Sequence, residues 1–190
     1  MTRPEASQEQ LIETFAATLE AAGGQTVVAS SPGDVLALVR DAAGTGADRG
    51  VWVSAGATDT FPQLENVLRE GGVVLQAPRD PATVRDAPLG ITAARLAIAE
   101  TGSVLLHEPD LAGRAVSLMT QRLIVLCPVA ALVPSLDEAA PVLREIARSG
   151  PSYATFVTGP SRTADIEREL AVGVQGPGVL LVVFLPDTAS

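Results

Sequence analysis

The sequence predicts an α/β fold, a three-layer α/β/α domain with a mostly parallel sheet. Short apolar segments alternate with longer segments of helical periodicity, the order expected of a layered α/β fold. Apolar residues make up 47% of the chain and aromatic residues only 3%, so the core must consist of Val, Leu, Ile and Ala, as in buried parallel sheets. The length of 190 residues suits a single domain over residues 1–190, with frayed ends at 1–6 and 186–190.

Capping and turn residues bound the expected elements in the first half of the chain. Ser7 and Gln10 form a capping box that begins a helix, and Gly23-Gly24 ends it. The second helix has Pro32 at its first position. The elements expected next are a strand at Thr26–Ser30, this second helix from Ser31 through Val39, a strand at Gly50–Ala55, a helix at Thr60–Glu70, a strand at Val73–Gln76 and a loop at Pro78–Pro88.

The second half continues the alternation. Its strongest strand is Leu123–Cys127, an apolar run closed by Pro128. Ser135 and Glu138 form another capping box. The other expected elements are a helix at Ile91–Ala99, a strand at Ser103–His107, a helix from Ser135 to Arg148, a strand at Tyr153–Thr158, a helix at Thr163–Ala171 and a strand at Val179–Leu185.

Charge and targeting signals narrow the partners. The net charge is −9 and the chain has no Lys, so we expect neither nucleic acid nor a membrane surface as a partner. Polar residues follow Met1, which argues against a signal peptide. An apolar run of the roughly 20 residues that span a bilayer does not occur in the sequence. We therefore expect a cytoplasmic protein.

The cysteine and histidine counts limit the cofactors. The chain has one Cys, Cys127, and one His, His107. An iron–sulfur cluster or a structural zinc ion usually takes about four such ligands. We expect no cofactor in this chain and no metal site, with any iron–sulfur cluster in a partner. Cys127 is expected to be a buried small side chain. His107 could bind a metal ion with Glu108 and Asp110, but a single His at a strand end is more often structural.

The most informative segment is Gly159-Pro160-Ser161-Arg162-Thr163-Ala164-Asp165-Ile166-Glu167. It follows an apolar strand, and the expected helix after it would offer free N–H groups to an anion, with Arg162 as a bidentate donor. Ligands bind at such strand ends in open α/β sheets. The alternative is that Ser161, Thr163 and Asp165 only cap a helix while Arg162 forms a salt bridge.

Three further segments could contribute to the same site. Glu100, in Ala99-Glu100-Thr101-Gly102, is poorly placed for the dipole of the helix expected before it, which suggests a nucleophile, a base or a hydrogen-bond acceptor. An exposed helix-terminal Glu is the alternative. The loop Gly173-Val174-Gln175-Gly176-Pro177-Gly178 could approach a ligand closely or simply connect two elements. The ligand-binding residues expected in total are Gly90, Thr92, Glu100, Thr101, Gly102, Gly159, Ser161, Arg162, Thr163, Asp165, Gln175 and Gly176, with Glu100 as the candidate catalytic residue.

Together these segments resemble the LUD domain family, in its lactate-utilisation protein C (LutC) type. The run at 159–167 is the most specific part, and Gly173–Pro177, Gly90-Ile91-Thr92 and Ala99–Gly102 complete the resemblance over a core of about residues 30–185. The resemblance implies a fold like the NagB/RpiA/CoA-transferase group. It also implies a place in L-lactate oxidation beside iron–sulfur proteins of LutA and LutB type.

The chain departs from the family pattern at two positions. Gln175 stands where the family usually has His, and Leu123 ends a Thr120–Leu123 run where the family commonly has Pro-x-x-His. Gln keeps a hydrogen bond but cannot titrate, which favours an accessory or binding role over catalysis. The leading hypothesis is an accessory subunit that holds an anionic ligand or a partner at the 99–102/159–165 surface. The alternatives are a stand-alone enzyme or binding protein for an anionic small molecule (a CoA thioester, sugar phosphate or folate) and a purely structural domain.

Overall fold

A computed structural model describes residues 7–44, 50–85, 87–149, 153–164, 170–172 and 176–186. Its helices are α1 (Gln8–Ala21), α2 (Pro32–Ala43), α3 (Ala55–Thr60), α4 (Leu64–Glu70), α5 (Pro81–Val84), α6 (Leu111–Met119) and α7 (Ala140–Arg148), with 3-10 turns at Val129–Ala131 and Leu136–Ala139. Its strands are β1 (Gln25–Val28), β2 (Val51–Val53), β3 (Leu75–Gln76), β4 (Gly90–Ile98), β5 (Ser103–His107), β6 (Arg122–Pro128), β7 (Leu132–Val133), β8 (Ala154–Val157), β9 (Arg162–Ala164), β10 (Leu170–Val172) and β11 (Val179–Leu185).

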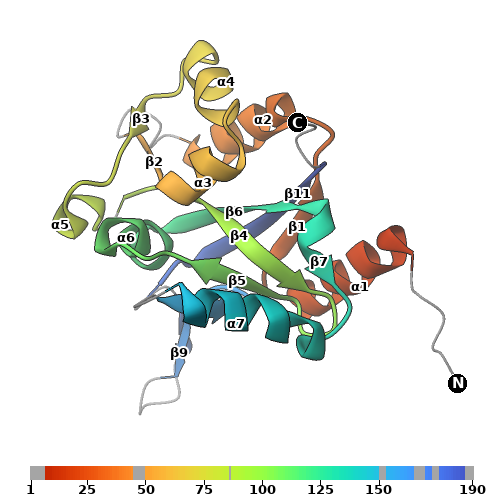
Figure 1. Cartoon of the computed structure of the whole chain (residues 1–190). Helices are drawn as coiled ribbons and strands as arrows, with labels where there is room; N and C mark the ends of the chain where they lie inside the picture. Colours follow the sequence, from red (N-terminus) through yellow and green to blue (C-terminus); the bar gives the residue numbers. More distant parts are fainter. Residues whose placement is uncertain are drawn as a thin grey trace, which may run out of the picture.

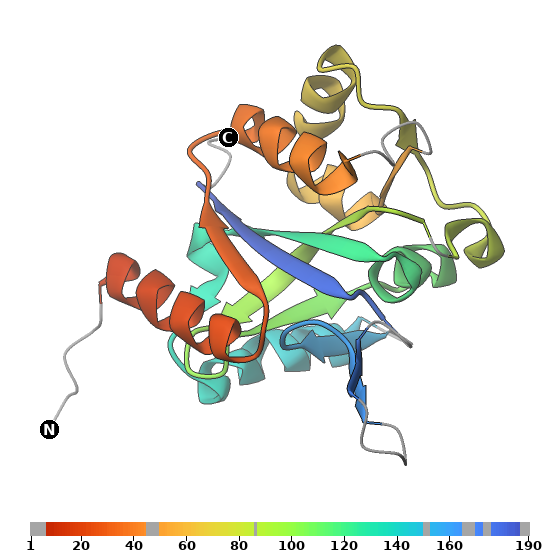
Figure 2. The ribbon, with the colours of Figure 1, turned by 180° about the vertical axis from the view of Figure 1, so that it is seen from behind.

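The main sheet is mostly parallel, as the sequence predicts. Its order is β1-β11-β6-β4-β2-β3, and each of these pairs is parallel. The antiparallel strands β5 and β8 extend from β4, which also pairs with β7. Figures 1 and 2 show α2, α3 and α4 over one face of the sheet and α1 on the other face. The α/β prediction is therefore confirmed.

Strand β11 shows why both faces must be covered. Leu181, Val183 and Leu185 belong to the core beneath α2 and α4, while Leu180, Val182 and Phe184 belong to the core beneath α1. Consecutive side chains of a strand point to opposite faces, so a continuous apolar run requires helices on both. The Phe184 ring packs edge-on against Phe15 of α1, with ring centroids 5.0 Å apart. A third core, between the β4–β5 ribbon and α7, includes Leu96, Leu105 and Ile146.

The helix expected at Ile91–Ala99 is wrong, because this segment is β4. All but Ala93 and Arg95 are buried along the strand. A strand buried on both faces reads as a near-continuous apolar run, and periodicity alone does not distinguish it from a buried helix. Its Ala and Leu content favoured a helix, but tertiary pairing with four strands outweighs such local propensity.

The helix expected at Thr163–Ala171 is also wrong. Strands β9 and β10 form an antiparallel hairpin in which Ala164 pairs with Leu170 and Arg162 pairs with Val172. The entry into the hairpin is fixed by the Ser161 N–H, which donates to the Pro177 carbonyl at 2.8 Å. This backbone bond pairs the two arms of the segment, whereas a helix would satisfy its hydrogen bonds locally.

Several boundaries also differ from the expected ones. The Thr60–Glu70 helix is two shorter helices, α3 and α4, and the Pro78–Pro88 loop contains the single turn α5. Helix α6 is not among the expected elements, although Asp110 is a good N-cap whose carboxylate accepts the Gly113 N–H at 2.7 Å. The capping box of Ser7 and Gln10 at α1 is confirmed.

Candidate functional site

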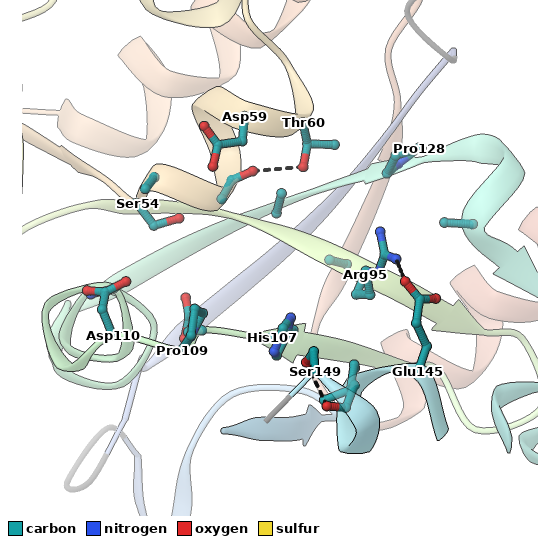
Figure 3. A pocket seen from close by; sticks show the side chains of 18 residues that line it. Ser54, Asp59, Thr60, Arg95, His107, Pro109, Asp110, Pro128, Glu145 and Ser149 are labelled. Atoms are coloured by element: carbon teal, nitrogen blue, oxygen red, sulfur yellow. Dashed lines mark hydrogen bonds and ion pairs between the residues drawn. The ribbon is translucent and has the colours of Figure 1, made fainter. Parts of the chain in front are cut away.

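A cavity of about 500 Å³ opens at the carboxyl ends of β2, β5 and β6, beside the middle of β4. Figure 3 shows its labelled lining residues: Ser54 after β2, Asp59 and Thr60 of α3, Arg95 of β4, His107 of β5, Pro109, Asp110, Pro128, Glu145 and Ser149. Strand carboxyl ends are where open α/β sheets bind ligands. Its volume falls in the range of small-molecule sites. The cavity is therefore the best candidate for a ligand site within the described residues.

The course of β4 explains why a cavity forms here. Residues 90–93 pair with β2 and β6, whereas residues 94–98 pair with β5 and β7. The register of the β4–β5 pair shifts between Ala94 and Leu96, which is an irregularity of the β-bulge type. Residues on both sides of this shift, Ala93 to Arg95, line the cavity together with residues of α3 and α7. Arg95, at the shift, lines the cavity and pairs with Glu145 at 2.8 Å.

Glu108 lies in the wall of the cavity and is only 6% exposed. The Thr92 hydroxyl donates to its Oε1 at 2.9 Å, and the Ser54 hydroxyl donates to Thr92 Oγ1 at 3.0 Å. The Ser117 hydroxyl contacts its Oε2. These hydroxyls come from three separate segments of the chain, so the tertiary fold assembles a hydrogen-bonded setting for one buried carboxyl group.

Burial raises the pKa of Glu108 above its ordinary value, because desolvation penalises the charged form. The hydrogen bonds from Ser117 and Thr92 and the positive charge of Arg114 act in the opposite direction, while the Asp110 carboxylate raises the pKa further. A carboxyl group that holds its proton more tightly at the wall of a cavity is a typical feature of functional sites. The residues next to Glu108 in the sequence do not indicate a raised pKa, because its hydrogen-bond partners come from other segments of the chain.

The predicted Ala99–Gly102 segment lies at the other end of the β4–β5 hairpin. Glu100 follows a strand, not a helix as expected, and its side chain is exposed. Its Oε2 accepts the Leu136 N–H at 3.3 Å, and its own N–H donates to the Pro134 carbonyl at 3.0 Å. Gly102 has φ +62°, and a Cβ there would come within 2.5 Å of the Leu19 nitrogen. The turn thus packs directly on α1.

The Gly159 segment packs against the same helix. Gly159 has φ +74°, and a Cβ there would lie 2.4 Å from the Ala22 carbonyl oxygen at the end of α1. The hydroxyls of Ser103 and Thr158 lie 2.6 Å apart and join the two segments. The structure therefore places the 99–102 and 159–161 turns close together.

The remaining predicted residues are distributed over different places. Arg162 and Thr163 belong to β9, so the described residues do not begin a helix at Thr163, where the anion site was expected. Asp165 and Gln175 lie outside the described residues. Gly176 packs near Ser161. Ligand binding by these residues stays a prediction.

Two predicted residues lie in the sheet instead. Gly90 lies against Thr120, and Thr92 belongs to the hydrogen-bonded setting of Glu108. Thr92 is thus the one predicted ligand residue whose described contacts lead to the cavity wall. Leu123 is buried in β6 beneath α1.

The Cys and His residues have clear places. Cys127 is buried in β6, as predicted, and His107 lines the cavity. Among the described residues, His, Cys, Asp and Glu side chains do not form a group of three or more that could hold a metal ion. The described helices are too short or too polar to span a membrane.

Comparison with known proteins assigns the family. The model of the LUD domain matches residues 12–185. The chain belongs to the LUD domain family. Strands β4, β5 and β11 and the turns at Gly102 and Gly159 are therefore parts of a LUD domain.

Curated relatives of this LUD domain share one name. The chain is 37% identical over 115 residues to "Lactate utilization protein C" of Bacillus velezensis, and the match covers 59% of this chain and 48% of that protein. It is 36% identical over 104 residues to "Lactate utilization protein C" of Bacillus subtilis, covering 53% and 43%. "Lactate utilization protein C 1" of Bacillus mycoides is 42% identical over 104 residues, covering 53% and 44%. The matched region spans less than half the length of these relatives.

A solved structure supports the fold. A DUF162 family protein from Deinococcus radiodurans superposes with a TM-score of 0.70 at 22% identity, covering 95% of this chain and 99% of that one. The LUD domain described here and that protein share the same α/β architecture.

Proposed function

We propose that this LUD domain acts in lactate utilisation, as an accessory subunit beside iron–sulfur proteins of lactate oxidation. The observation that carries the proposal is the 36% to 42% identity to proteins named lactate utilization protein C. Function is inferred here from relatives and not from the fold, since α/β folds of this kind host many activities.

The side-chain chemistry of the chain supports an accessory role. A protein that carries an iron–sulfur cluster usually binds it through several cysteine thiolates. The chain has one cysteine, and Cys127 is buried in the core beneath α1. In the proposed assembly the clusters are held by partner proteins, and this chain supplies a rigid surface.

The paired turns at 99–102 and 159–161 are the proposed contact surface. Both are held against α1 by glycines that approach its backbone closely, and the Ser103–Thr158 contact joins them. Glu100 and Thr101 are exposed on this surface. The β9–β10 hairpin continues from Ser161 and projects from the body of the domain (Figures 1 and 2). A rigid surface with a projecting hairpin suits a protein partner, because little ordering is needed on binding.

The test is a pull-down of the tagged full chain from its native cells grown on lactate, with captured proteins identified by mass spectrometry. Glu100→Arg should reduce recovery of iron–sulfur proteins by at least about tenfold, because reversing a charge at an interface costs several kcal/mol. Glu70→Arg, the same charge change at the exposed end of α4 on the other face of the sheet, should leave recovery unchanged. Purification without partners from lactate-grown cells would overturn the proposal.

A second candidate function, a binding protein for a small molecule, is favoured by the cavity at Glu108. The sequence resemblance leads to the expectation of an anion such as a CoA thioester, a sugar phosphate or a folate. The lining includes the carboxyl groups of Asp59, Glu108, Asp110 and Glu145. Acidic groups repel an anionic ligand at close range, which weighs against such molecules in this cavity.

A further inference from the structure

Strand β1 lies at one edge of the main sheet (Figures 1 and 2). Among the described strands it pairs with β11 alone. Directly after β1, the Ala29 N–H donates to the Phe184 carbonyl at 2.8 Å, so the backbone groups of every second residue of β1 face β11. The N–H and C=O groups of Thr26 and Val28 therefore face the open side, where a further strand can pair with them.

This edge lacks the features that usually prevent a strand from being added. Residues Gln25–Val28 include neither a charged residue nor a proline, and the Val28 side chain is 57% exposed. The opposite end of the strand order is different, because β3 has only two residues and Pro78 follows shortly after it. Strand β1 is therefore the less protected of these two edges.

A groove of about 550 Å³ lies beside this edge, lined by Ala16 and Glu20 of α1 and by residues 23–27. Thr26 lies on the α1 face of the sheet, because its ladder partner Val182 belongs to the core beneath α1. Within the described part of the chain, Thr26 Oγ1 is the one buried side-chain oxygen or nitrogen without a hydrogen-bond partner. Side chains of an added strand lie about 5 Å from such a residue, close enough for a donor to reach it.

Helix α1 gives the groove a negative charge. Glu9, Glu13 and Glu20 are exposed, and together with Ala16 they have the spacing that places side chains on one face of a helix. Helix α1 contains neither Lys nor Arg. Since Ala16 and Glu20 line the groove, this acidic stripe borders the open edge of β1. Charge complementarity therefore favours an occupant with positive side chains.

We propose that the open edge of β1 binds an extended basic segment of a partner protein, which adds to the sheet as a further strand with its Arg or Lys side chains toward α1. Backbone hydrogen bonds to Thr26 and Val28 provide the affinity, and the glutamates of α1 select the basic residues. The proposal goes beyond the role in lactate utilisation, and the pull-down with Glu100→Arg does not test it.

A second copy of this chain complements the edge less well. Antiparallel pairing of two β1 edges around a twofold axis places both α1 helices on the same face of the joined sheet. Their acidic stripes would then repel each other, and the chain as a whole has a net charge of −9.

Isothermal titration of the full chain with a heptapeptide blocked at both ends, Thr-Arg-Val-Arg-Val-Arg-Thr, tests this surface. Its Arg side chains lie on one face of an extended strand. We expect saturable binding to one site per chain. The control peptide has Glu in place of each Arg, and it should give no heat beyond that of dilution. Absence of binding by the basic peptide, or equal binding by the acidic one, would overturn the proposal.

Backbone methylation separates strand addition from simple attraction of a cation to an acidic protein. In an extended peptide the N–H groups of alternate residues face the same side. One form of the basic peptide is N-methylated at its three Arg residues, and the other at its two Val residues and the last Thr. One form should bind at least about tenfold more weakly than the unmodified peptide and the other within about twofold, because only one set of N–H groups faces β1. Equal affinities of the two forms would contradict strand addition.

Variants of Val28 locate the binding edge. Val28→Pro removes an outward N–H, which edge strands tolerate, so the variant should unfold cooperatively in urea and bind the basic peptide at least about tenfold more weakly. Val28→Ala is the matched control, because it removes the exposed side chain and keeps the N–H, and it should bind within about twofold of the wild type. Equal affinities of these two variants would place the peptide elsewhere.

Charge variants test the contribution of α1 and do not depend on whether Val28→Pro folds. Glu20→Gln should weaken binding of the basic peptide by about twofold to fivefold, the effect of one exposed charge pair. Glu70→Gln, the same change at the exposed end of α4 on the other face of the sheet, should leave the affinity unchanged. Equal affinities of Glu20→Gln and Glu70→Gln would rule out the acidic stripe as the source of selectivity.

Light scattering of the free chain over a range of concentrations tests the other occupant. We expect any self-association to be the same in the wild type and in Val28→Pro, because the edge is free for a partner. A dimer that Val28→Pro dissociates would show that a second copy covers the edge, and it would overturn the proposal.

Discussion

The two ends of strand β5 meet different surroundings. At its start, the Ala99–Gly102 turn lies on α1, and Ser103 contacts Thr158 of the neighbouring strand. At its end, His107 and the following Glu108 line a cavity of about 500 Å³. The family motifs lie at the first end, whereas the cavity that Glu108 lines and the raised pKa of its carboxyl group lie at the second.

This difference separates two reasons why a segment is distinctive. The glycines of the turns are required by close packing on α1, which calls for a positive φ and no side chain. The Glu108 setting depends on Ser54, Thr92 and Ser117, which only the fold brings together. The glycines of a motif that is conspicuous in the sequence can thus serve packing, while the side chain with unusual chemistry lies elsewhere in the fold.

The largest expected effect is at the turn on α1. Gly102→Ala should lower the free energy of unfolding by roughly 2–4 kcal/mol, from left-handed backbone strain together with overpacking. The reason is that its Cβ would lie 2.5 Å from the Leu19 nitrogen, a backbone atom that cannot easily move. Gly72→Ala is the matched control: φ is +80° there and a Cβ meets nothing within 4 Å. Urea unfolding should show a loss of only about 1 kcal/mol for the control; similar losses in both variants would contradict the packing explanation.

The second-largest expected loss of unfolding free energy concerns the hydroxyl network at the other end of β5. Thr92→Val keeps the shape of the side chain and removes the donor to Glu108 and the acceptor for Ser54. Leaving buried polar groups unsatisfied should cost about 1–3 kcal/mol in urea unfolding at neutral pH. Ser103→Ala, which removes one contact at the start of β5, should cost only about 1 kcal/mol. A larger loss for Ser103→Ala would reverse the ranking of the two ends.

The pH dependence of stability follows from the raised pKa of Glu108. A carboxyl whose folded pKa lies above its unfolded value stabilises the protein fully below the unfolded value of about 4.5, and this contribution is lost as the pH rises through the folded value. Glu108→Gln does not titrate there. The stability of the wild type relative to this variant should therefore fall as the pH rises above about 4.5.

Urea titrations from about pH 4 to pH 7.5 measure this difference, and the contributions of other groups cancel in it where they are unchanged. The charged groups that act on Glu108 are Asp110 and Arg114, and the same cavity is lined by Asp59, Arg95, His107 and Glu145. A difference that does not vary with pH would mean that Glu108 has an ordinary pKa in the folded protein.

The sequence predicts the layered α/β class because the signals for it are local. The apolar run Leu123–Cys127, the capping box at Ser7 and the proline at position 32 each depend on a few neighbouring residues, and all three mark the elements expected. Local signals give the wrong element at residues 91–99, where they predict a helix. The helical composition of this segment is local, whereas the pairing that makes it a strand comes from β5, which follows after a short turn, and from the more distant strands β2, β6 and β7.

Some features of the candidate site could likewise be predicted from the sequence, and others could not. Proximity of the 99–102 and 159–161 turns could be predicted through the family resemblance, and the structure joins them through Ser103 and Thr158. Glu108 could not be recognised as a buried acid, because the side chains that bury and bond it come from positions 54, 92 and 117. A pKa shift that is caused by burial can be recognised only once the fold is known.

The smallest expected effect concerns Glu100. Glu100→Gln should change the free energy of unfolding by less than about 0.5 kcal/mol, since the side chain is exposed and an amide oxygen can still accept the Leu136 N–H. Growth of the native cells on lactate, measured with the chromosomal variant, should nevertheless slow if the carboxylate contacts a partner. Unchanged growth together with unchanged stability would leave the glycines as the only important part of this turn. Slower growth at unchanged stability would instead place a functional contact on the same surface that packing on α1 holds in place.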